Sequence, residues 1–203
     1  MTTIQAKIAD IDDLQARRIS AVKNLLREDL SAIETIEATV EIIDVEMGKE
    51  PEYLTVGKTP LERVHKLLAK LDSIRRSKER GSVVLAAEKS LSNKFIGQVE
   101  SIFNNLPKPL KWQSFLVNDL ILLTDIPLKV QTASVKHGLN KAQTKALPRL
   151  EQVSDKVFHE VTQKGFIPFK DQNNNFLPKL KLNEFSAREI QAFAQDFLGY
   201  HQF

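Results

Sequence analysis

The sequence predicts an all-α fold, a helical bundle of five to seven helices that opens with one very long amphipathic helix. Two observations predict it. Apolar residues recur about every 3.6 positions through most of the chain, which is the repeat of an α-helix. The 7 glycines and 8 prolines fall mainly between these apolar runs, where helices end. With 203 residues, of which 42% are hydrophobic, the chain is long enough to bury a sizeable core.

The first helix is expected to run from about Thr3 to Met47, because this stretch contains no proline or glycine and Gly48 follows it. Its apolar stripe has the repeat of a straight helix, which favours packing in a bundle over a supercoiled dimer. The stripe is weakest where five residues separate Leu14 from Ile19. Because isoleucine dominates the stripe and is only a fair helix former, burial against a partner surface must supply much of the stability.

Helix-capping and helix-breaking residues place the later helices. Thr59, Pro60 and Glu62 form a strong helix start after a linker at 49–58. This helix is expected to break or kink at Gly81. The next helix is expected to end at Pro107, and a compact helix should then cover about Leu110 to Thr124. A further helix should start at Pro127, with a stop or kink at Pro148. The helical region that follows should end at Gly165.

The last part of the chain changes character. Two runs rich in phenylalanine and proline flank a polar turn within residues 165–182, which indicates a short irregular loop or hairpin. Ser186 and Glu189 form a capping box for a final helix. The expected organisation is a long helix at 1–48, a bundle core at 59–165, and an aromatic loop plus C-terminal helix at 166–203 that folds as one cooperative domain with the core.

Several classes of protein are disfavoured by the composition. The chain has no cysteine, which excludes disulfides, thiolate metal sites and cysteine catalysis. Its N-terminus lacks the apolar core of a secretory signal, and its most apolar stretch, 115–127, is shorter than the about 20 residues of a membrane-spanning helix. Its four histidines lack metal-ligand spacing. We therefore expect a soluble intracellular protein, in the cytoplasm, a virion or another large assembly, with no metal, no cofactor, no small-molecule substrate and no enzymatic activity.

Charge is distributed unevenly along the chain. Residues 1–50 carry 6 basic and 11 acidic side chains, whereas residues 51–150 carry 17 basic and 8 acidic ones. The acidic second half of the first helix opposes the helix macrodipole and therefore calls for a basic partner surface. The basic middle of the same chain could supply that surface, as could another copy, or the middle could bind a separate anionic partner.

The candidate residues for binding an anionic partner or nucleic acid are cations in two groups of the basic middle. Such side chains contact phosphates and add affinity without reading sequence. The alternative is a solvated helix face whose cations suit the macrodipole. No aromatic residues interleave with either group, as stacking on single strands would require. The candidates are Arg75, Arg76, Lys78, Arg80, Lys136, Lys141, Lys145 and Arg149, and His137 also belongs to the second group.

The candidate protein-interface residues are apolar side chains of the first helix and of the aromatic C-terminal part. Aromatic anchors commonly dominate the energetics of interfaces, so the C-terminal segment could dock on a neighbouring subunit. The alternative is a loop folded back over the core. The candidates are Ile33, Ile36, Val40, Ile43, Phe166, Phe169, Phe176, Phe193 and Phe197.

Three functions follow from these patterns. The leading one is a non-catalytic, structural subunit of a homo- or hetero-oligomeric assembly that acts through protein–protein contacts. The alternative is a nucleic-acid-binding structural protein, coat-like or packaging, that uses the basic middle. The third is a peripheral membrane protein, which is disfavoured because the polar face of the first helix is acidic whereas anionic membranes attract lysine and arginine.

Overall fold

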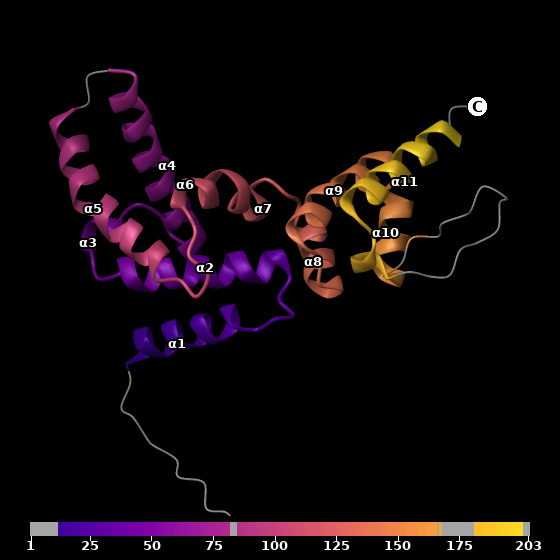
Figure 1. Cartoon of the computed structure of the whole chain (residues 1–203), viewed down its shortest axis with the longest axis horizontal. Coiled ribbons are helices and arrows are strands. Elements are labelled where there is room, and N and C mark those ends of the chain that lie inside the picture. The colour runs from indigo at the N-terminus through magenta and orange to yellow at the C-terminus, as the bar shows by residue number, and fades with distance from the viewer. Residues whose placement is uncertain (1–11, 82–84, 166, 168–180, 201–203) are drawn as a thin grey trace, which may run out of the picture.

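The computed structural model describes residues 12–81, 85–165, 167 and 181–200, and these are mostly helical (Figure 1). The all-α prediction is therefore confirmed, although the described residues contain more helices than the predicted five to seven, because several are only one turn long. A π-helical segment, Phe115–Asp119, joins α6 to α7, and a 3-10 turn, Leu182–Glu184, precedes α11. The α-helices are α1 (Asp13–Leu25), α2 (Ala32–Met47), α3 (Pro51–Leu54), α4 (Pro60–Glu79), α5 (Ala86–Asn104), α6 (Trp112–Ser114), α7 (Ile121–Thr124), α8 (Leu128–His137), α9 (Lys141–Val153), α10 (Asp155–Lys164) and α11 (Ala187–Tyr200).

The predicted single long helix is wrong within the described residues. A turn at 26–31 divides it into α1 and α2, which fold back side by side (Figure 1). Ser31 starts α2 with a capping box: its hydroxyl accepts from the Glu34 backbone N–H at 3.2 Å, and the Glu34 carboxylate accepts from the Ser31 N–H at 2.9 Å. This Ser-x-x-Glu signal was present in the sequence. The apolar stripe hid it, because the spacing of apolar residues continues across the turn.

Two hydrophobic clusters form the core. The first gathers side chains of α1–α7, and the second gathers side chains of α8–α11 with Ile167 and the 182–185 segment. They meet at Ile126, which packs against both clusters. The Ala32 N–H donates to the Leu139 carbonyl at 2.9 Å and so ties the start of α2 to the turn between α8 and α9.

The predicted interface residues of the first helix lie in the first cluster. Ile33, Ile36, Val40 and Ile43 are all buried there, with Ile43 fully inaccessible. Burying each such side chain stabilises the fold by roughly 1.5–3 kcal/mol. The apolar stripe of α2 therefore forms the core of this chain and does not face a partner.

Several predicted helix boundaries are confirmed and others are corrected. Thr59 caps α4 by accepting from the Glu62 N–H at 3.2 Å, and Ser186 accepts from the Glu189 N–H at the same distance. Gly81, in a left-handed conformation, follows the end of α4. Pro148, in contrast, lies inside α9, which continues to Val153. The expected compact helix at 110–124 is divided by the π-helical segment.

The aromatic loop falls mostly outside the described residues, which leaves Phe166, Phe169 and Phe176 without a structural account. Phe193 on α11 is half-buried and packs against the second cluster. The backbone of Phe197 belongs to α11, but its side chain lies outside the described part. Among the described helices, none has both the length and the apolar character needed to cross a bilayer.

Gly165 gives a first prediction, on stability. It ends α10 with φ +71, and a Cβ added there would lie 2.8 Å from Cε1 of His137. Gly165→Ala should therefore combine left-handed strain with a clash and lower the free energy of unfolding by about 1–3 kcal/mol. Gly138→Ala is the matched control, since Gly138 has φ +60 with no atom within 4 Å of such a Cβ. Urea unfolding of both variants measures the difference, and equal losses would show that the His137 contact has no effect.

Candidate nucleic-acid interface

The first basic group lies at the C-terminal end of α4, where carboxylates of the same helix neutralise part of it. Nη2 of Arg75 lies 2.7 Å from the Asp72 carboxylate, and its Nη1 lies 2.5 Å from that of Glu79. Nε of Arg76 lies 2.7 Å from the other oxygen of Asp72. The hydrogen bond to Asp72 is the main reason why the pKa of Arg75 is raised above its usual value. Both guanidinium groups are therefore engaged within the helix.

The last two cations of this group lie further out. Lys78 and Arg80 are exposed, and Arg80 is the residue that follows α4. Arg80 forms no hydrogen bond or ion pair through its side chain with any residue in the described ranges. As far as the described residues extend, the guanidinium at the end of α4 is therefore unpaired.

In the second basic group, Lys136 and His137 bind the C-terminal end of α10. Nζ of Lys136 donates to the carbonyls of Thr162 and Gln163 at 3.3 and 3.2 Å, and Nε2 of His137 donates to the Thr162 carbonyl. These carbonyls belong to the last turn of α10, where a cation suits the negative end of the macrodipole. Both side chains therefore hold α8 against α10.

The remaining three cations form a stripe along α9. Lys141, Lys145 and Arg149 follow one another at intervals of four residues, so they share one face of the helix. All three are exposed, whereas Leu147 and Leu150 on the opposite face are completely buried in the second cluster. At 1.5 Å per residue the three positions span about 12 Å. We call these three residues the α9 cationic stripe.

The members of the stripe differ in their partners. Lys141 forms an ion pair with Asp119, the last residue of the π-helical segment. Lys145 and Arg149 make no side-chain hydrogen bond or ion pair to any residue that the structure describes. Their charges are therefore available to an anion outside the chain.

The α8–α9 unit holds the stripe in a defined orientation. α8 ends at His137, and a turn of three residues leads to α9: Gly138 adopts a left-handed conformation, Leu139 follows, and Asn140 caps α9. Inside the unit, the hydroxyls of Ser134 and Thr144 are hydrogen-bonded at 2.6 Å and are both completely buried. Two helices joined by such a short, glycine-containing turn have the connectivity that αα-hairpins and helix-turn-helix motifs share.

A buried glutamine fixes α9 on its other side. Nε2 of Gln143 donates to the backbone carbonyls of Asn183 and Phe185 at 2.9 and 2.6 Å. These carbonyls belong to the segment that leads into α11, the helix that packs most extensively on α9. The backbone of α9 is therefore braced by α8, α11 and the 182–185 segment, while its cationic face is left exposed.

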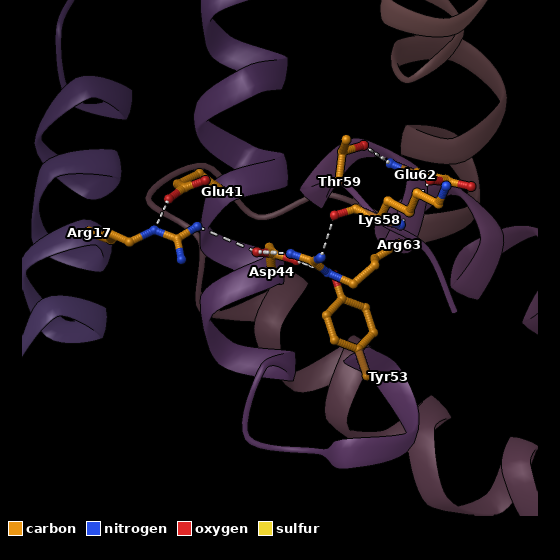
Figure 2. A network of polar contacts seen from close by, with 8 residues as sticks. All are labelled: Arg17, Glu41, Asp44, Tyr53, Lys58, Thr59, Glu62 and Arg63. Carbon is orange, nitrogen blue, oxygen red and sulfur yellow. Dashed lines mark hydrogen bonds and ion pairs between the residues drawn. The ribbon is translucent and has the colours of Figure 1, made fainter. Parts of the chain in front are cut away.

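Away from the basic groups, a cluster of polar side chains lies around Asp44 in α2 (Figure 2). Its carboxylate is 4% exposed and accepts from Nε and Nη2 of Arg63 at 2.8 and 2.9 Å, from the Tyr53 hydroxyl at 2.8 Å, and from Arg17 at 3.4 Å. Burial alone would raise the pKa of Asp44, but the hydrogen bonds from Arg63 and Tyr53 outweigh it and lower the pKa. Because every partner comes from a different helix, the cluster ties α1, α2, α3 and α4 together.

This cluster identifies which cations meet the acidic half of α2. Arg63 belongs to the basic middle of the chain, as expected, but Arg17 also contacts Glu41 at 2.6 Å, and Arg18 forms an ion pair with Glu46. Arg17 and Arg18 lie within the acidic first fifty residues, so the charge totals did not indicate them. The Asp44 cluster is a structural site, since its donors are satisfied within the chain. In the described ranges, this cluster included, no three acidic or histidine side chains gather as a metal site would require.

Comparison with known proteins gives one informative similarity. The chain is 28% identical over 121 residues to a protein from Thermus thermophilus named "Probable plasmid-partitioning protein ParB". The aligned part covers 60% of this chain and 35% of the relative, so the chain spans about a third of the length of the curated relative that it matches. No family model and no solved structure matches the chain. Over more than half of its length, this chain is thus similar to a protein named for the partitioning of plasmids.

Proposed function

We propose that this protein is a non-catalytic DNA-binding protein and that its ligand is duplex DNA of the plasmid type. The observation that carries the proposal is the α9 cationic stripe. Lys145 and Arg149 in this stripe are exposed and pair with no described residue, and contacts with neighbouring segments hold their helix in place. The similarity to a protein named for plasmid partitioning supports this ligand, because plasmids are duplex DNA. It also supports an intracellular location, which we propose on the same ground.

The geometry of the α8–α9 unit supports duplex binding in particular. In helix-turn-helix proteins the second helix enters the major groove while cations around it contact phosphates. That groove is about 12 Å wide, enough to admit an α-helix. Single-strand binding is disfavoured, because no exposed aromatic side chain accompanies the stripe on α9.

DNA binding is favoured here over the assembly-subunit and packaging roles that were expected from the sequence. An assembly subunit acting through Ile33, Ile36, Val40 and Ile43 is not proposed, because these side chains fill the core. A coat-like or packaging role gives way to DNA binding of the kind that the relative's name implies. Within the basic middle, the stripe is favoured over Arg75 and Arg76, whose charges are paired with Asp72.

The test is fluorescence anisotropy with a labelled DNA duplex at low salt, alongside the single strand and an RNA of the same sequence. The unmodified protein should bind the duplex best. Lys145→Ala combined with Arg149→Ala should weaken duplex binding by about tenfold or more, since two phosphate contacts are lost. Thermal unfolding should be unchanged, because neither side chain contacts a described residue through its charge.

The matched control is Lys108→Ala combined with Lys111→Ala. These two lysines are also exposed and, within the described ranges, form no ion pair, but they lie between α5 and α6. Both double variants remove two positive charges, so the control accounts for net charge. An equal loss of affinity in both would contradict the assignment to α9, and no binding by the unmodified protein would contradict DNA binding itself.

A further inference from the structure

The ion pair between Lys141 and Asp119 joins the two halves of the molecule at the start of the α9 cationic stripe. Lys141 is the first residue of α9 and belongs to the second half, whereas Asp119 ends the π-helical segment that packs in the first. The carboxylate side chain is only 14% exposed, while the lysine is 46% exposed. The acid is therefore held in place, and the lysine is the partner that is free to turn outwards.

The start of α9 is a position where an anion is favoured. A helix N-terminus carries partial positive charge, so the ammonium of Lys141 at the first helical position adds to an already positive end. Both a carboxylate and a phosphate are anions that stabilise such an end. Asp119 supplies this anion from within the chain.

We propose that the Asp119 carboxylate competes with the backbone phosphates of nucleic acid for Lys141. While Lys141 is paired with Asp119, a phosphate cannot pair with this lysine, so Asp119 weakens binding by the α9 cationic stripe. This inference rests on the proposed function. In the free protein the stripe offers two cations that pair with no described residue, Lys145 and Arg149. Lys141 becomes the third only when it exchanges the Asp119 carboxylate for a phosphate, and the intact ion pair opposes that exchange.

Two consequences distinguish this exchange from an ordinary structural ion pair. The affinity for nucleic acid is set partly by an acid that never contacts the ligand, so removing the charge of Asp119 must increase affinity. The increase must also act through Lys141, because that is the only member of the stripe, within the described part of the chain, that pairs with an acid. A purely structural pair would leave affinity unchanged or lower it when broken.

The experiment measures binding of a labelled DNA duplex by Asp119→Asn across a series of salt concentrations. We expect the variant to bind about three- to tenfold more tightly at low salt, and the plot of log affinity against log salt to steepen by about 0.9, which corresponds to one added phosphate contact. Asp125→Asn is the control, because it removes the same charge from an exposed acid six residues away, whose carboxylate accepts a hydrogen bond from the Thr124 hydroxyl. It should change affinity less than twofold.

The decisive comparison adds Lys141→Ala. Alone it should weaken binding only slightly, and in combination with Asp119→Asn it should remove the gain. A gain that persists without Lys141, or an equal gain in Asp125→Asn, would show a general charge effect and overturn the proposal. Unchanged affinity in Asp119→Asn would overturn it while leaving the proposed function intact. Absence of duplex binding by the unmodified protein would instead overturn the proposed function, and this inference with it.

Discussion

Replacing Asp44 by alanine is expected to lower the free energy of unfolding by about 3–5 kcal/mol, the largest stability effect that we predict. The substitution leaves Arg63, whose side chain is only 15% exposed, without its counter-charge, and leaves the fully buried Tyr53 hydroxyl without its acceptor. A buried charge or hydroxyl that loses its partner pays its full desolvation cost. Because Asp44 joins four helices, the loss should appear as a shift in the midpoint of urea unfolding.

Asp29→Ala is the control for this prediction. Asp29 also pairs with an arginine, Arg27, at 3.0 Å, but its side chain is 74% exposed. Exposed pairs contribute little to stability, so the midpoint should barely move. If both variants lost the same stability, the buried network around Asp44 would contribute no more than an exposed ion pair.

The same network predicts how stability depends on pH. Although burial raises the pKa of Asp44, hydrogen bonds from Arg63 and Tyr53 outweigh that effect, so the pKa in the folded protein lies below its ordinary value of about 3.9. The stabilisation is therefore fully present above that ordinary pKa and is lost as the pH falls through the lower, folded-state pKa. Unfolding free energies of the unmodified protein and of Asp44→Ala should differ most at neutral pH and converge in acid. Parallel curves would contradict this account.

The helical fold was predictable because periodicity and capping are local. Thr59, Ser186 and their glutamates mark helix starts that the structure contains. The turn before Ser31 was missed because the apolar residues on either side of it keep helical spacing, and the folded-back α1 still presents Ala21 to the core. An apolar stripe predicts which residues are buried, but it does not predict whether the chain reverses its direction between them.

The candidate cations were predictable as a set, but their partners were only partly so. Asp72 lies three and four residues before Arg75 and Arg76, so the neutralisation of these arginines could have been read from the sequence. The docking of Lys136 against the end of α10 could not, because 26 residues separate it from Thr162. For the other cations, contacts between helices decide which are engaged, and within the described residues Arg80, Lys145 and Arg149 are the candidates that make no side-chain hydrogen bond or ion pair.

Reversing both charges, by Lys145→Glu with Arg149→Glu, is expected to have the largest effect on binding. The double variant removes two phosphate contacts and places two carboxylates against the DNA backbone, so the affinity for a duplex should fall by about a hundredfold or more at low salt. The fold should survive, because both side chains are exposed and make no ion pair with a described residue. Unchanged thermal unfolding together with lost binding would separate the interface from the core, whereas loss of both would show a structural role.

The salt dependence of duplex binding tests the central claim most directly. The logarithm of the affinity is plotted against the logarithm of the salt concentration for the unmodified protein and for Lys145→Ala with Arg149→Ala. If these side chains contact phosphates, the slope of the double variant should be shallower by about 1.8, which is about 0.9 for each contact. Identical slopes for the two proteins, or no salt-dependent binding by either, would contradict the assignment of DNA binding to the α9 cationic stripe.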